Sequence, residues 1–170
     1  MTLANFQLRN AQRLSVLISL SLLCIAAAGQ TTAEATKHNM DVLLSGQGSS
    51  LIDKQIVLYG VTAQGKPGIT NTAPKNQGLR HTPAFWIGPD KGERILVAIP
   101  SGLSPVDTSN ITRSVEAGDI VDITGTVRTA PGATQLKAVY RLSDEGVARV
   151  RRAGVIVEAG SVVVHGPLKK

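Results

Sequence analysis

The chain has 170 residues, which is room for one domain of ordinary size plus a removable or disordered end, and too little for a second full core. Its hydrophobic share is 42% but its aromatic share is only 3%, so any core must be aliphatic. The formal net charge of +6 is spread along the chain, which is less typical of a polyanion-binding surface than a clustered charge would be.

Residues 1–29 have the composition of a secretory signal peptide. Arg9 and Arg13 form a basic start, and an uncharged apolar run follows from Leu14 to Ala28 and ends in small residues. An uncleaved membrane anchor is the alternative. The fifteen residues of the run rise only about 22 Å as a helix, however, short of a hydrocarbon core of about 30 Å. We therefore expect cleavage after Ala28 or Gly29 and a periplasmic or secreted protein.

The single cysteine, Cys24, lies inside that apolar run. A lipoprotein signal would have a small residue directly before it, where Leu22 and Leu23 stand, so lipid attachment is disfavoured. Without the signal, the chain has no disulfide, no thiol metal ligand and no thiol nucleophile. Its stability would then come from packing.

Residues 30–50 are predicted to form a flexible lead, because Thr, Ala, Gly and Ser dominate them. Their apolar stretch from Val42 to Leu44 could instead dock as a turn of helix or as an edge strand. The domain itself is predicted to span residues 51–166, followed by a tail at 167–170.

The first predicted strand runs from Gln55 to Gln64 and has Gly60 as a bend. Its alternation gives two faces, one with Ile56 and Leu58 and the other with Val57, Tyr59 and Val61. The segment from Gly65 to Pro83 is too polar and too rich in turn formers for an interior element, so it is predicted to be a long exposed loop.

Two short strands are predicted next, at Ala84–Ile87 and Arg94–Ile99. The residues between them, Gly88–Gly92, include Pro, Asp and Gly and favour a turn, so the two strands should pair antiparallel. Ser101–Ser114 is predicted to be irregular, and Ser114–Ala117 to form a single helical turn.

The next strand, Gly118–Val127, is the best specified. Val121, Ile123 and Val127 share one face, while Gly125 permits a sharp coil or the close approach of another backbone. We interpret Asp119 as a turn-forming residue at the start of this strand. Asp122 lies three residues later on the opposite face, so the two are not a carboxylate pair.

One helix is predicted between Ser143 as N-cap and Gly154 as left-handed C-cap. Leu142 and Val147 are spaced as a hydrophobic staple across its start. Its apolar stripe is narrow, so it should rest on the strands as a plug or flank. A last strand is predicted at Val155–His165.

These elements predict a mainly β fold, a five-stranded antiparallel barrel with one or two short helices, because helices do not alternate regularly with strands. The order of motifs resembles the OB-fold, over about residues 51–165. It is closest to anticodon-binding-like OB domains and to small secreted bacterial OB-fold proteins of the cell envelope. The predicted helix follows the fourth strand, whereas the family's usual helix follows the third. The matching motifs are Ile56–Val61, Phe85–Gly88, Ile95–Ile99, Gly118–Val127 and Gly154–Ala159.

The resemblance also implies where a ligand would lie, across the second and third strands and the loops beside them. Phe85 and Trp86 alternate, so an exposed Trp86 could stack on a base or sugar. We favour packing of both rings instead, because single-strand binders usually have several aromatic residues. The candidate ligand-binding residues are Arg80, His81, Phe85, Trp86, Arg94 and Arg128, with Lys66 and Lys75 less central.

The sequence gives little support for an enzymatic function. His38, His81 and His165 are far apart and have no second ligand at metal spacing, so we expect neither a metal nor another cofactor. The first hypothesis is a non-enzymatic secreted or periplasmic binding module for an envelope component or an anionic ligand. The alternative is a binder of single-stranded nucleic acid or another polyanion that uses the Phe85/Trp86 strand.

Overall fold

The computed structural model describes residues 34–65 and 82–167. The chain divides into two units, Met1–Ala35 and Thr36–Lys170, and residues 34–35, the part of the first that is described, are helical. The predicted signal peptide and residues 66–81 of the predicted long loop lie outside the described residues. The described elements of the second unit are a helix that reaches residue 44, η1 (Gly48–Leu51), β1 (Gln55–Thr62), β2 (Ala84–Ile87), β3 (Ile95–Ala98), β4 (Val106–Asp107), β5 (Asp119–Thr129), α2 (Ala133–Tyr140), α3 (Asp144–Ala153) and β6 (Val155–Pro167).

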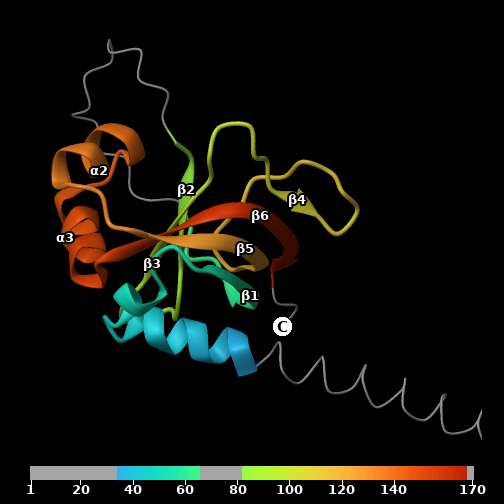
Figure 1. Cartoon of the computed structure of the whole chain (residues 1–170). Helices are drawn as coiled ribbons and strands as arrows, with labels where there is room; N and C mark the ends of the chain where they lie inside the picture. Colours follow the sequence, from blue (N-terminus) through green and yellow to red (C-terminus); the bar gives the residue numbers. More distant parts are fainter. Residues whose placement is uncertain (1–33, 66–81, 168–170) are drawn as a thin grey trace, which may run out of the picture. The chain divides into compact units, whose positions relative to one another are not determined.

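The strands form one curved, mixed sheet in the order β1-β5-β6-β3-β2, with the short β4 paired to β6 (Figure 1). β5 pairs antiparallel with β1 and β6, and β2 pairs antiparallel with β3. β3 and β4, however, run parallel to β6. The prediction of a purely antiparallel sheet was therefore wrong, because alternation along a strand fixes its faces but not the direction of its neighbours.

The prediction of a closed barrel was also wrong. β1 and β2 approach each other at one end, where an isolated bridge joins Ala63 to Ile87 and the Gln64 N–H donates to the Trp86 carbonyl at 2.7 Å. These contacts do not continue along the two strands, so the sheet stays partly open. The arrangement is OB-like, since that fold is a five-stranded and partly open Greek-key barrel.

β5 and β6 form the long central pair, and Gly125 sets their bend. A Cβ at Gly125 would lie 2.7 Å from the Glu158 carbonyl oxygen, and the β5–β6 register shifts between Thr124 and Gly125. The close approach predicted for this glycine is confirmed. Gly60 interrupts β1 for a different reason, its left-handed backbone: it has φ +64°, and the register with β5 shifts between Leu58 and Val61. Val61 is consequently buried on the face of Ile56 and Leu58, not on the opposite face as predicted.

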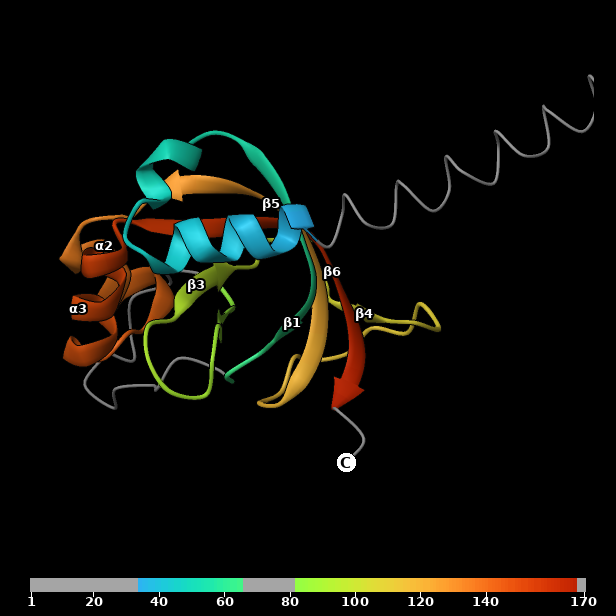
Figure 2. The ribbon, with the colours of Figure 1, turned by 90° about the horizontal axis from the view of Figure 1, so that it is seen from below.

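The inner cluster, defined as the apolar side chains on the concave face of the strands, is aliphatic apart from Phe85. Val121, Ile123 and Val127 of β5 are fully buried in it, as their alternation predicts. The helix that ends at residue 44 lies below the strands in Figure 1 and crosses in front of them in Figure 2, and it buries Leu43 completely in this cluster. Residues 36–44, which the sequence placed in a flexible lead, are therefore helical, and the alternative of a docked turn of helix holds for Val42–Leu44.

The outer cluster lies on the other face of β2, β3 and the start of β6, under α2 and α3. α3 has the predicted caps: the Ser143 hydroxyl accepts the Gly146 N–H at 3.2 Å, and Gly154 has φ +72°. Leu142 and Val147 are both buried in this cluster, which confirms the staple. α3 thus flanks the sheet. The principal members of the outer cluster are Trp86, Leu96, Ala98, Leu136, Leu142, Val147, Val150 and Ile156.

Candidate ligand pocket

The six residues predicted from the resemblance lie in different environments. Phe85 is 1% exposed in the inner cluster, and Trp86 is 7% exposed in the outer cluster. The two rings point to opposite faces of the strand, as alternation requires, and both faces are covered. The prediction that both rings are packed is therefore confirmed, and neither ring is exposed enough for a base to stack on it. Arg80 and His81 lie outside the described residues, as do Lys66 and Lys75.

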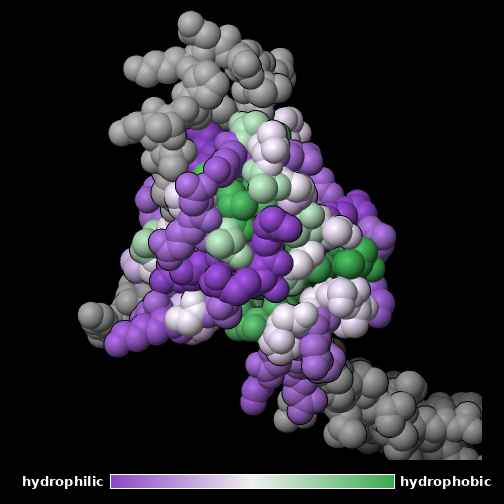
Figure 3. Space-filling view, turned by 90° about the vertical axis from the view of Figure 1, so that its left-hand side faces the viewer, coloured by the Kyte–Doolittle hydropathy of each residue, from purple (hydrophilic) through white to green (hydrophobic). Residues whose placement is uncertain are grey.

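Trp86 is held by α3 as well as by the sheet. The Arg149 guanidinium lies 6.0 Å from the centroid of the Trp86 ring, within the range of a cation–π contact. Arg149 also donates to the Gly92 carbonyl at 3.1 Å and pairs with Glu145. The surface on the side of α2 and α3 is mostly hydrophilic, with a small hydrophobic area near its centre (Figure 3). The helices therefore bury their apolar sides against β2 and β3.

Arg94 and Arg128 make separate contacts. Arg94 donates to the Asp90 carbonyl at 2.9 Å within the β2–β3 connection. Arg128, at the end of β5, pairs with Glu158 at 2.9 Å and with Asp53 at 2.7 Å. Hydrogen bonds to these two carboxylates raise the pKa of Arg128 above its ordinary value. Each guanidinium is thus engaged by the protein's own acceptors.

A pocket of about 520 Å³ lies where β2 begins and β3 ends; we call it the end pocket. Its volume is in the range of about 300–1,000 Å³ that is usual for small-ligand sites. Backbone hydrogen bonds fix its rim: the Thr82 N–H donates to Val139, the Ile99 N–H to Pro83 and the Arg113 N–H to Pro105. The lining residues are Thr82, Pro83, Ala84, Phe85, Ile99, Leu103, Ser104, Pro105, Thr112, Arg113, Ser114, Val115, Tyr140 and Arg141.

An ion pair fixes one side of the end pocket. Arg113 Nη2 donates to both carboxylate oxygens of Asp119, at 2.9 and 3.2 Å, and the Asp119 side chain is only 3% exposed. Asp119 also accepts the Glu116 N–H at 2.9 Å, which confirms its predicted role in the turn. The helical turn predicted for Ser114–Ala117 is not formed, because this carboxylate and the β-turn at 117–118 satisfy the backbone instead.

The C-terminal end of α2 supplies the other side. Arg141 adopts the left-handed conformation, with φ 55°, and its N–H donates to the Leu136 carbonyl as the helix C-cap. Burial raises the pKa of the half-buried Tyr140 phenol, with a smaller contribution from the negative charge of Glu158. Tyr140 is therefore a neutral hydroxyl donor at physiological pH.

Sequence reasoning missed this pocket because it missed α2. A signal was present: Ala133–Tyr140 follows Pro131-Gly132, is free of breakers, and has Leu136 and Tyr140 four residues apart. Ala84 and Phe85 belong to the predicted second strand, but most of the other lining residues come from segments without regular structure, where periodicity gives no information. The wall from Leu103 to Ser114 belongs to a stretch predicted only as irregular, and Val115 to a predicted helical turn that does not form.

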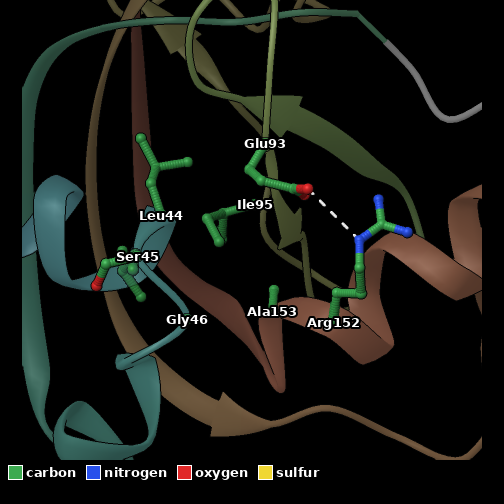
Figure 4. Close-up of a pocket in the computed structure, with 8 residues that line it drawn as sticks. Leu44, Ser45, Gly46, Glu93, Ile95, Arg152 and Ala153 are labelled. Carbon is green, nitrogen blue, oxygen red and sulfur yellow. Dashed lines mark ion pairs between the residues drawn. The ribbon is translucent and has the colours of Figure 1, made fainter.

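A second pocket, of about 200 Å³, lies between the end of the helix before η1 and the end of α3 (Figure 4). Leu44 and Ile95 form part of its apolar wall, and Arg152 pairs with Glu93 at 3.4 Å across its edge. Its volume is below the usual range for a ligand site, so the end pocket is the stronger candidate.

The described residues include no group of three or more His, Cys, Asp or Glu side chains that could hold a metal ion. No helix within residues 34–65 and 82–167 is long and apolar enough to cross a membrane.

Comparisons with known proteins assign no family to the chain. No family model matches it, and no curated protein matches it by sequence. Among solved structures, it is similar to an aspartyl tRNA synthetase from Entamoeba histolytica, with 13% identity and a TM-score of 0.40. The similarity covers 77% of this chain and 21% of the synthetase, so the chain spans about a fifth of that protein's length. A similarity this low assigns neither a fold nor a function.

Proposed function

We propose that this chain is a non-enzymatic binding module of OB-like fold that holds a small ligand in the end pocket, and that it works in the periplasm or outside the cell. The observation that carries the proposal is the end pocket, about 520 Å³ in volume and lined by apolar side chains together with hydroxyl and guanidinium groups. No lining residue that the structure describes is His, Cys, Asp or Glu, the usual general bases.

The coverage of the strands supports the end pocket over the face that the resemblance implies. α2 and α3 occupy the outer face of β2 and β3 and bury Trp86 there. A ligand on that face would have to displace two helices and their apolar contacts. Among the residues that the structure describes, no helix or strand covers the end pocket in this way.

The test of the pocket is binding of N-phenyl-1-naphthylamine, a neutral apolar dye whose fluorescence rises when it leaves water. We expect saturable binding that Ser104→Trp abolishes, because the indole would fill the pocket from its exposed rim. Ser101→Trp is the matched control, since Ser101 is exposed on the same loop and does not line the pocket. Equal binding by the two variants would contradict the proposal.

The location rests on the signal-like pattern of residues 1–29. Cell fractionation with mass spectrometry of the mature N-terminus tests it. We expect a chain that begins near residue 30 in the periplasm or the medium, and an unprocessed cytosolic chain would contradict it.

The alternative, a binder of single-stranded nucleic acid or another polyanion, is favoured by the net charge of +6. It is weakened by the burial of Phe85 and Trp86. Titration of the single tryptophan's fluorescence with an oligothymidylate at low salt distinguishes the two, since stacking on Trp86 would quench it and be lost as salt rises.

A further inference from the structure

The most deeply buried lining residues of the end pocket are apolar. Phe85, Ile99 and Val115 are 1%, 6% and 4% exposed. Leu103 and Pro105 also belong to the lining. Removal of apolar surface from water is the main driving force for binding in a pocket with such walls. A ligand that uses this wall must therefore have an apolar body.

The charged lining residues of the end pocket are two arginines, and each is engaged within the protein. Arg113 Nη2 donates to both carboxylate oxygens of the buried Asp119, at 2.9 and 3.2 Å. Arg141 likewise has an interaction of its own. Among the residues that the structure describes, no acidic side chain lines the pocket. A charged ligand group would therefore lose its hydration without meeting a free opposite charge, which makes its burial costly.

Hydroxyl groups make up the rest of the polar lining. None of them makes a hydrogen bond within residues 34–65 and 82–167. A hydroxyl donates one hydrogen bond and accepts others, so it is a good partner for an uncharged carbonyl or hydroxyl of a ligand. The lining hydroxyls belong to Thr82, Ser104, Thr112, Ser114 and Tyr140.

The Tyr140 phenol differs from the other lining hydroxyls in its burial and its acidity. Burial raises its pKa, with a smaller contribution from the negative charge of Glu158, so the proton stays on the oxygen at physiological pH. Ser104, Thr112 and Ser114, in contrast, are exposed residues whose hydroxyls stay in contact with water. A ligand that covers the half-buried phenol must offer it an acceptor, because a buried donor without a partner is unfavourable.

We infer that the ligand of the end pocket is an uncharged amphiphile. Its apolar body packs against Phe85, Ile99 and Val115. A carbonyl or hydroxyl oxygen at its polar end accepts a hydrogen bond from the Tyr140 phenol. This inference rests on the proposed function, because it names the ligand chemistry of the same pocket.

The test compares eight-carbon probes by isothermal titration calorimetry with the full chain at neutral pH. The uncharged probes are 2-octanone and 1-octanol, the anion is octanoate and the cation is octylammonium. We expect each uncharged probe to bind at least about tenfold more tightly than either ion, because an ion must shed its hydration without a free opposite charge in the pocket. Ser104→Trp should abolish the binding of 2-octanone, and the control Ser101→Trp should retain it.

Tyr140→Phe removes the inferred donor and keeps the aromatic ring. It should weaken the binding of 2-octanone by about three- to tenfold, as the loss of one neutral hydrogen bond implies. The binding of N-phenyl-1-naphthylamine, which depends on apolar contact, should stay unchanged. Tyr59→Phe is the matched control, since Tyr59 is exposed and does not line the pocket. Equal affinities of the two variants for 2-octanone would overturn the hydrogen bond to Tyr140.

The results separate the inference from the function on which it rests. If octanoate or octylammonium binds more tightly than 2-octanone and is lost in Ser104→Trp, the uncharged ligand is overturned and the pocket stands. Binding of the naphthylamine dye without binding of 2-octanone or 1-octanol has the same meaning. Binding of 2-octanone that survives Ser104→Trp would overturn the inference by placing the probe elsewhere. A failure of every probe and of the dye would overturn the pocket itself.

Discussion

The inner and outer clusters lie on opposite faces of the same strands and are closed by different means. The inner cluster is enclosed by the curved sheet and, at one end, by the helix that buries Leu43. The outer cluster has strands on one side only and depends on α2 and α3 for the other. The inner cluster therefore establishes the fold, whereas the outer cluster determines which surfaces are left for a ligand.

The largest expected effect comes from the inner cluster. Leu43→Ala should lower the free energy of unfolding by about 2–5 kcal/mol, because it leaves a cavity at a fully buried position. Urea unfolding followed by circular dichroism measures it. Lys37→Ala is the control, since Lys37 is exposed on the same helix. Equal stabilities would show that this helix is not part of the folded core.

The outer cluster should yield a smaller loss and a different optical signal. Leu136→Ala in α2 is expected to lower the free energy of unfolding by about 2–4 kcal/mol. It should also shift the emission of Trp86, the single tryptophan, to longer wavelength in the folded protein, because loosened helices admit water to the ring. The folded Leu43→Ala chain should keep the unshifted emission. A shift in both variants would show that the clusters act as one unit.

The elements that sequence predicts well are those whose cause is local. Val121, Ile123 and Val127 alternate because a half-buried strand requires it, and Ser143 and Gly154 cap α3 through contacts within a few residues. The close approach at Gly125 was also predictable, since a glycine inside a strand often marks a point where another backbone comes near.

The parts that sequence did not predict arise from segments distant in the chain. The parallel pairing of β3 with β6 depends on a crossover of more than fifty residues, which no local pattern encodes. The docking of Leu43 could be given only as an alternative, because the end of the sheet on which it packs is formed by segments far away in the sequence. The end pocket combines β2, two irregular stretches and α2, so it exists only once all of them are in place.

A variant of Ser143, the N-cap of α3, tests how far the outer cluster depends on this helix, because it weakens α3 without changing the side chains of the cluster. Ser143→Ala should lower the free energy of unfolding by about 1 kcal/mol, as it removes the acceptor of the Gly146 N–H. Ser143→Asp should restore most of this loss, since a carboxylate accepts the same bond and suits the helix N-terminus. Chemical denaturation of the three proteins measures the effect, and an unchanged Ser143→Ala chain would show that α3 is held by packing alone.

Tyr140 gives the smallest predicted effect and joins the outer cluster to the end pocket, since it packs against the one and lines the other. Burial raises its pKa in the folded protein above that of the unfolded chain, which is about 10. The folded state therefore keeps a proton that the unfolded chain loses. The stabilising contribution is complete below about pH 10 and is lost as the pH rises through the folded-state pKa.

The chain has two tyrosines, so Tyr59→Phe leaves Tyr140 as the single phenol to titrate. Ultraviolet absorbance of its phenolate should give a midpoint above about pH 10. Tyr140→Phe should lose less stability than the native chain between neutral pH and about pH 11, while Tyr59→Phe should keep the native loss. A Tyr140 midpoint at or below the ordinary value would show that water reaches the phenol freely, and the outer cluster would then be open at the side where it meets the end pocket.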